Sequence, residues 1–224
     1  MTGSSTHTIG AGTFNITHNL VIGNGTNSGT TVTAAANNPT INIANKLDVC
    51  VSCVNAITFT KGGTINFNTA SSSSWIDFSI AAKQDMGTVT VANGRTVTYW
   101  SNVVATKVTN AGIIQPLAAQ TLTLTGSGTG ASQPFLNTGT FTANTGTVNF
   151  TGTAATTVSE GPYNNLGVGT TADSTAVTYT FEGDPSIQGV LTVGNASSSA
   201  VDTLNAGSRL PTLGGCHPPS VITP

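Results

Sequence analysis

Short segments in which threonine or asparagine alternates with an apolar residue recur along almost the whole chain. In residues 147–151, Val148 and Phe150 point to one side of an extended backbone, whereas the two threonines and the asparagine point to the other. Threonine and valine are β-branched, which favours strands over helices. The same alternation predicts strands within 57–68, 87–100, 120–128, 176–184 and 190–195. The sequence therefore predicts an all-β protein.

Glycine and asparagine separate these segments. Gly62-Gly63 and Asn93-Gly94 predict tight turns, because both residue types accept a positive φ. Residues 102–118 have the weakest strand pattern, and we expect a loop there that could include a short helical turn.

The sequence also repeats itself weakly. TFTKGGTINF, which starts at Thr58, matches TFTANTGTVNF, which starts 82 residues later at Thr140. NLVIGNGTNS at Asn19 resembles VLTVGNASSS at Val190, about twice that distance away, and NLGVGTTADS at Asn165 is a third relative. These offsets suggest a module of about 85 residues built from strand-and-turn units of roughly 20 residues.

Two architectures fit short strands with such punctuation. A β-solenoid stacks one coil on the next and is expected to repeat, whereas a β-sandwich needs no long-range repeat. We therefore predict a right-handed parallel β-helix, with a β-sandwich as the alternative. Residues 1–208 are expected to form one solenoid domain. Residues 209–224 are expected to form a tail rich in proline and glycine, because proline has no N–H for a strand ladder.

The composition constrains the setting in which the protein works. Charged residues make up only 6% of the chain, against about 25% in a typical globular domain, and the net charge is -2. Six scattered basic residues cannot replace the phosphate counterions that nucleic-acid binding requires. The chain has no apolar run long enough for a membrane span, and its first residues show no signal-peptide pattern. A neutral surface rich in threonine, serine and asparagine favours a role outside the cell.

Several strings resemble the repeats of large bacterial secreted and surface proteins of the adhesin type. They include TLTLTGSGTG, GTFTANTGTVNFTGTAATT, GPYNNLGVG and GVLTVGN, and the similarity is clearest between residues 120 and 208. The repeats of those proteins form right-handed parallel β-helices. The resemblance implies an extracellular or cell-surface structural or adhesive module that is not an enzyme and needs no cofactor or metal. Its partners would be like modules stacked end to end, or surface glycans.

Aromatic side chains are the first candidates for a carbohydrate contact, because the face of a sugar packs on a ring. Tyr99 and Trp100 form the best pair, although neighbouring strand residues face opposite sides, so one ring should be buried. Trp75 follows a run of four serines and could mark a loop. We take Tyr99, Trp100 and Trp75 as possible ligand contacts.

Three alternatives compete with this interpretation. Glu182 and Asp184 could serve a polysaccharide-degrading enzyme, since glycoside hydrolysis uses two carboxyl groups. Thr-x-Thr pairs are typical of ice-binding solenoids, but their irregular spacing here predicts that they scatter over several faces. Cys50 and Cys53 could be small apolar strand residues, a disulfide, or metal ligands together with Cys216 and His217.

Overall fold

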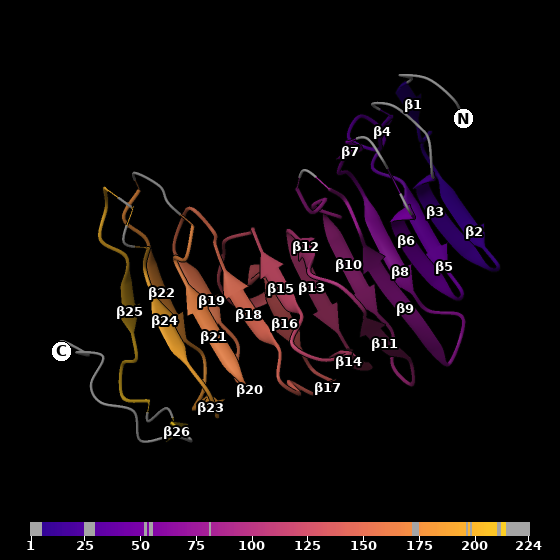
Figure 1. The fold of residues 1–224 in the computed structure, drawn as a ribbon. Helices are drawn as coiled ribbons and strands as arrows, with labels where there is room; N and C mark the ends of the chain where they lie inside the picture. Colours follow the sequence, from indigo (N-terminus) through magenta and orange to yellow (C-terminus); the bar gives the residue numbers. More distant parts are fainter. Residues whose placement is uncertain are drawn as a thin grey trace.

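The strands of the computed structural model stack into a parallel β-solenoid that runs from an N-terminal to a C-terminal end (Figure 1). The structure describes residues 6–24, 30–51, 53, 56–80, 82–171, 175–195, 197, 199–209 and 212–213. Every pair of neighbouring strands among these residues is parallel. This pairing confirms the predicted solenoid over the β-sandwich, whose sheets are antiparallel.

Two six-stranded sheets form the walls of the N-terminal part. Sheet B contains β2 (Thr13–Ile16), β5 (Thr40–Ile43), β8 (Thr64–Phe67), β10 (Thr88–Val91), β13 (Lys107–Asn110) and β16 (Phe135–Asn137). Sheet C contains β3 (Asn19–Asn24), β6 (Lys46–Val51), β9 (Ser72–Asp77), β11 (Thr96–Tyr99), β14 (Ile113–Pro116) and β17 (Thr140–Phe141). A shorter sheet A completes this part with β1 (Thr6–Thr8), β4 (Thr31–Thr33) and β7 (Thr58–Thr60).

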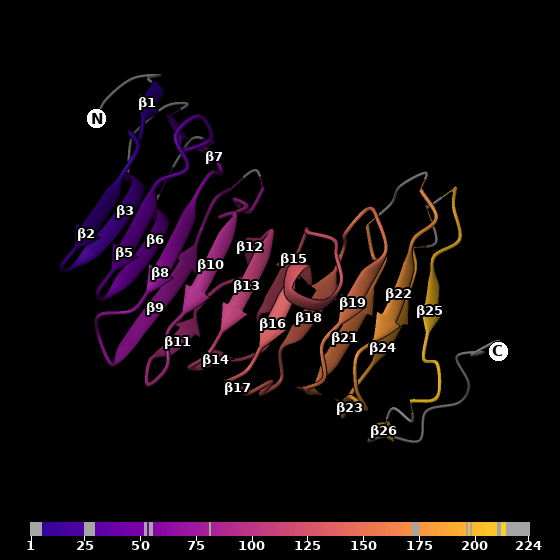
Figure 2. The ribbon, with the colours of Figure 1, turned by 180° about the vertical axis from the view of Figure 1, so that it is seen from behind.

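Three further sheets build the C-terminal part. Sheet D contains β12 (Val103–Ala105), β15 (Thr121–Leu124), β18 (Thr147–Phe150), β21 (Asn165–Val168) and β24 (Leu191–Val193). Sheet E contains β19 (Thr156–Val158), β22 (Thr178–Phe181) and β25 (Thr203–Asn205). Sheet F contains β20 (Pro162–Tyr163), β23 (Ser186–Ile187) and β26 (Thr212–Leu213). A short 3-10 helix, η1 (Gly130–Ser132), protrudes from the wall (Figure 2).

The pairing register shows which sequence similarities reflect stacked coils. Residues that pair between successive coils are 17 to 28 positions apart in the sequence. The shortest separation joins Thr96 to Ile113, and the longest joins Lys46 to Ser74. The strings at Asn165 and Val190 do stack, because Leu166 pairs with Leu191 in sheet D. The strings at Thr58 and Thr140 do not, since they run through sheets A and B and through sheets C and D, respectively. Their likeness reflects the same strand-and-turn pattern used on different walls.

The core follows directly from the alternation in the sequence. In β18, Val148 and Phe150 are buried while Thr147 and Asn149 are partly exposed, as predicted. Large rings fill the interior, and burial raises the pKa of the Tyr99 and Tyr163 phenols well above their usual range. The largest fully buried side chains include Trp75, Tyr99, Tyr163, Tyr179, Phe67, Phe135 and Phe150.

Residues 102–118 are not the loop that their sequence suggested. They form β12, β13 and β14, whose inward side chains Val103, Val108 and Ile114 are fully buried. A single residue, Thr106, separates β12 from β13, so neither glycine nor asparagine marks that boundary in the sequence. The helical turn occurs instead at η1. The predicted turns are confirmed at Gly63 and Gly94, whose φ angles are +70° and +71°.

The last described strand lies inside the segment predicted to be a tail. The Thr212 N–H donates to the Pro185 carbonyl over 3.1 Å, and Thr212 pairs with Ser186. The strand ladder therefore extends past residue 208, at least as far as Leu213. Among the described residues, no helix has the length and apolar content that a membrane crossing requires.

Candidate functional site

The structure separates the three aromatic residues that were predicted to contact a ligand. Trp75 and Tyr99 are 0% exposed and pair with each other across β9 and β11, so both rings belong to the core. Trp100, one residue beyond Tyr99, is 47% exposed. A ligand at the surface can therefore reach Trp100, but it cannot reach Tyr99 or Trp75, which lies in a strand and not in the loop that the serine run suggested.

Trp100 belongs to an outward-facing row at the end of sheet C. Its N–H donates to the Trp75 carbonyl over 3.0 Å, and the Leu117 N–H donates to the Tyr99 carbonyl over 2.9 Å. The register of Tyr99 with Trp75 and with Pro116 places Ile76, Trp100 and Leu117 at equivalent positions in three successive coils. Ile76 is buried, whereas Leu117 is 50% exposed.

Two more large apolar side chains are exposed in the loop that follows β9. Phe78 is 51% exposed and Ile80 is 58% exposed. We call the exposed residues Trp100 and Leu117 the Trp100 face. Sequence reasoning missed Leu117, Phe78 and Ile80, because an apolar residue just after a strand looks the same whether it points into the core or away from it.

A neutral polar row lies beside the Trp100 face. Ser74, Thr98 and Gln115 pair with one another in three successive coils of sheet C, two positions before the apolar row. The Gln115 Nε2 donates to the Thr98 Oγ1 over 3.2 Å. A ring and apolar side chains next to hydroxyl and amide groups are the combination that holds a sugar by its face and its hydroxyl groups.

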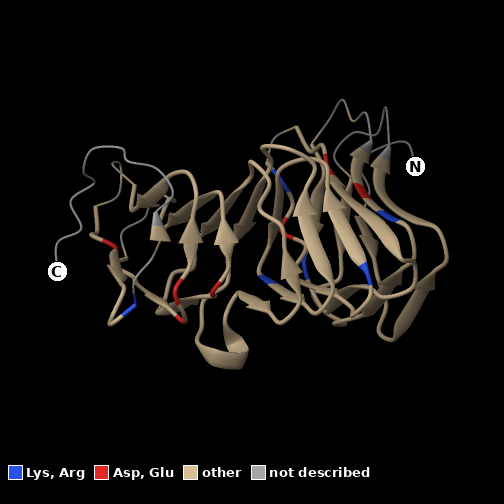
Figure 3. Ribbon diagram, turned by 90° about the horizontal axis from the view of Figure 1, so that it is seen from below, with Lys and Arg blue, Asp and Glu red and all other residues tan. Residues whose placement is uncertain are grey.

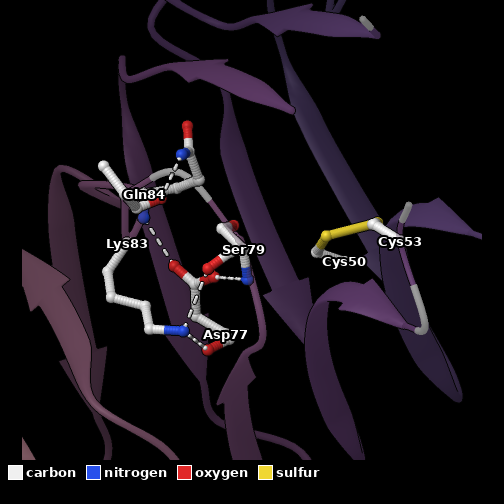
Figure 4. The surroundings of a disulfide bond; sticks show 7 residues. Cys50, Cys53, Asp77, Ser79, Lys83 and Gln84 are labelled. Carbon is white, nitrogen blue, oxygen red and sulfur yellow. Dashed lines mark hydrogen bonds between the residues drawn. A yellow bond between two sulfur atoms is a disulfide. The ribbon is translucent and has the colours of Figure 1, made fainter. Parts of the chain in front are cut away.

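A buried aspartate holds the loop that carries Phe78 and Ile80 (Figure 4). The Asp77 carboxylate accepts the Ser79 N–H over 2.8 Å and the Gln84 N–H over 2.5 Å. The Lys83 Nζ donates to the Asp77 and Ser79 carbonyls over 2.8 and 3.2 Å. Asp77 is 0% exposed, so this carboxylate is a structural clamp and not a candidate catalyst. An aspartate two residues before a serine after a strand is the sequence signal that could have found it.

The first two cysteines form a disulfide, which was one of the three alternatives (Figure 4). Cys50 is buried within β6 and has a φ of +67°, and Cys53 is partly buried three residues later. Val49 pairs with Asp77, so the disulfide and the loop that Asp77 holds begin at similar positions of successive coils. Cys216 and His217, which the metal alternative also needed, lie outside the described residues. The described residues contain no cluster of three or more His, Cys, Asp or Glu that could hold a metal ion.

Glu182 and Asp184, the two carboxylates considered for an enzyme, have different surroundings. Glu182 accepts a hydrogen bond from the buried Gln133 over 3.0 Å. Asp184 instead lines a surface groove of about 430 Å³ together with Glu160 from the preceding coil. The other residues of the groove are Asn137, Gly161, Pro162 and Ser186.

The Thr-x-Thr pairs scatter over the solenoid, as their spacing predicted. Thr58 and Thr60 lie in sheet A, Thr88 and Thr90 in sheet B, and Thr178 and Thr180 in sheet E. The pairs that start at Thr96 and Thr140 are in sheet C, and the pair at Thr121 is in sheet D. Sheet A nevertheless presents three such pairs in direct register, because Thr6 and Thr8 pair with Thr31 and Thr33, which in turn pair with Thr58 and Thr60.

No protein family, curated protein or solved structure matches this chain.

Proposed function

We propose that this protein is a non-catalytic structural and adhesive module that works outside the cell or on its surface and stacks end to end with like modules. The observation that carries the proposal is the unpaired strand edge at each end of the described part of the solenoid. Among the described strands, β1, β2 and β3 have a neighbour on one side only, and so do β24, β25 and β26. Unpaired strand edges of this kind are templates for pairing with another chain.

Side chains at the two ends support the same association. Phe14 and Val21 are 36% and 45% exposed at the N-terminal end, and Val193 and Val201 are 45% and 82% exposed at the C-terminal end. A second copy stacked on either end would cover these side chains.

The distribution of charge favours a head-to-tail arrangement. Residues 1–112 contain five basic and three acidic side chains, whereas residues 113–224 contain one basic and five acidic side chains. The opposite ends of two copies would therefore attract each other.

A location outside the cell is supported by the disulfide and by the surface. Disulfides persist in oxidising compartments and are rare in the cytosol. Charged residues are thinly spread over the solenoid (Figure 3), so its walls are largely neutral hydroxyl and amide groups.

Proline at Val193 is expected to prevent stacking without unfolding the chain. The Gly194 N–H and the Val190 carbonyl both bond to β21. Because the backbone groups of successive strand residues point to opposite edges, the Val193 N–H points away from β21, toward the unpaired edge. Electron microscopy of the wild-type protein at rising concentration should show filaments one coil wide, and Val193→Pro should give single short rods. Its free energy of unfolding should stay within about 0.5 kcal/mol of the wild type, as for a surface substitution.

Thr192→Pro is the matched control, because the Thr192 N–H points to β21 and its loss removes a bond inside the module. This variant should unfold at lower urea concentration than Val193→Pro. Wild-type filaments that form equally well with proline at Val193 would contradict stacking through this end.

Carbohydrate binding at the Trp100 face is the second candidate, and the exposed ring beside the Thr98 and Gln115 row favours it. In a glycan-array experiment, Trp100→Ala should weaken binding by about tenfold or more, because aromatic anchors carry a large share of the binding energy. Val201→Ala removes an apolar side chain that is more exposed than Trp100 (82% against 47%) and lies far from this face, so it should leave binding unchanged. Equal binding by both variants would place the glycan contact elsewhere.

A further inference from the structure

The outer surface of sheet B carries a regular array of threonine and asparagine residues that includes one of the Thr-x-Thr pairs, Thr88 and Thr90. Strands β2, β5, β8 and β10 each present a threonine and, two residues later, an asparagine or a threonine. These pairs are in direct register from coil to coil. The eight residues, which we call the Thr/Asn array, are Thr13, Asn15, Thr40, Asn42, Thr64, Asn66, Thr88 and Thr90.

Buried side chains beneath β5, β8 and β10 and hydrogen bonds between the amides hold the array in place. The intervening side chains Ile41, Ile65 and Val89 are at most 3% exposed, which fixes the outward direction of their neighbours, whereas Phe14 of the end strand β2 is 36% exposed. The amides also bond along the asparagine column: the Asn42 Nδ2 donates to the Asn15 Oδ1 over 2.7 Å, and the Asn66 Nδ2 donates to the Asn42 Oδ1 over 3.0 Å.

The threonine column is free to bind something outside the protein. None of the hydroxyls of Thr13, Thr40, Thr64 and Thr88 bonds to another residue in the described part of the chain. Threonine is stiff at χ1, so these hydroxyl and methyl groups lose little side-chain entropy when they bind.

The array is also electrically neutral. None of its eight residues is charged, and the next strand of sheet B, β13, begins with Lys107. The Lys107 Nζ donates to the Ala131 carbonyl in η1 over 2.5 Å, so its charge is directed to that segment. A neutral, flat array does not match an anionic polymer or a charged protein surface.

We propose that the Thr/Asn array binds the ordered water lattice of an ice surface. Its rows repeat about every 4.8 Å from coil to coil and about every 6.6 Å between the two columns of one strand. Such a surface presents hydroxyl and methyl groups on a fixed two-dimensional grid, so each added coil extends contact with a lattice and not with one small molecule. The proposal uses sheet B alone and does not rest on the stacking or glycan contacts proposed above.

Ice-recrystallisation inhibition by the purified chain tests the proposal. The wild-type protein should keep ice grains small, and Thr64→Lys, at the centre of the threonine column, should require at least about tenfold more protein, or about 1.4 kcal/mol. Thr147→Lys is the matched control. Thr147 is an outward threonine of β18 that lies between Thr121 and Asn165 in sheet D, so this variant should keep the wild-type activity.

Three results would overturn the proposal. The first is that the wild-type protein has no effect on the size of ice grains. The second is that Thr64→Lys and Thr147→Lys lose the same amount of ice-recrystallisation inhibition. The third is that the protein sediments with crystalline cellulose or chitin in a way that depends on Thr64, while it has no effect on ice. The last result would assign the array to a neutral polysaccharide surface. Trp100→Ala should keep the activity on ice, which separates failure of this proposal from failure of the glycan proposal.

Discussion

Replacing Trp75 with alanine is expected to lower the free energy of unfolding by about 3–5 kcal/mol, the usual cost of truncating a buried aromatic side chain. Trp75 is fully buried and pairs with Leu47 in one neighbouring coil and with Tyr99 in the other. Its removal therefore leaves a cavity shared by three coils. Urea denaturation followed by circular dichroism measures the loss, provided that the transition is two-state.

Two further variants show whether burial is the cause. Trp100→Ala changes the same residue type at a half-exposed position and should shift the free energy of unfolding by no more than about 0.5 kcal/mol. Trp75→Phe should cost less than Trp75→Ala, because it keeps most of the ring and removes a buried indole N–H that has no partner. Comparable losses for Trp75→Ala and Trp100→Ala would refute the assignment of Trp75 to the core.

Replacing Asp77 with alanine is expected to cost about 3 kcal/mol or more, because hydrogen bonds to a charged acceptor are worth about 1.5–3 kcal/mol each. Two backbone N–H groups, those of Ser79 and Gln84, lose their acceptor in this variant. The Gln84 side chain accepts the Phe59 N–H over 2.7 Å, so release of the loop also affects the edge of β7. The same urea titration measures the loss, and hydrogen exchange should show faster exchange at Ser79 and Gln84.

Ser79→Ala is the control for this clamp. The Ser79 hydroxyl is buried without a partner, so its removal should change the stability by no more than about 0.5 kcal/mol while the backbone N–H stays bonded to Asp77. A loss in Ser79→Ala as large as that in Asp77→Ala would mean that packing of the loop, and not the carboxylate, holds it in place.

The course of residues 102–118 shows where sequence reasoning reached its limit. Alternation predicted strands wherever several threonines separated the apolar residues, but β12, β13 and β14 together contain one threonine and are joined by turns of one and two residues. Their strand character depends on partners in the coils above and below. Val108, for example, pairs with Val89 and Phe135, which are 19 and 27 positions away. No local pattern carries such information.

The candidate site divides in the same way. The sequence indicated that Tyr99 and Trp100 face opposite sides, and one is buried while the other is half-exposed. It could not indicate that Leu117 stacks beside Trp100, because the coils vary from 17 to 28 residues in length and the spacing between stacked residues is therefore not constant. The Thr/Asn array was missed for the same reason, since its threonines are 27, 24 and 24 positions apart.

By itself the sequence determined the all-β character and the inward or outward direction of residues within each strand. These properties depend on β-branched side chains and on a period of two, both of which are local. Only the tertiary structure decided which strands share a wall and which exposed residues meet there. The register between coils depends on the lengths of the turns, and these lengths vary along the chain. The residues that stack in successive coils therefore cannot be predicted from their separation in the sequence.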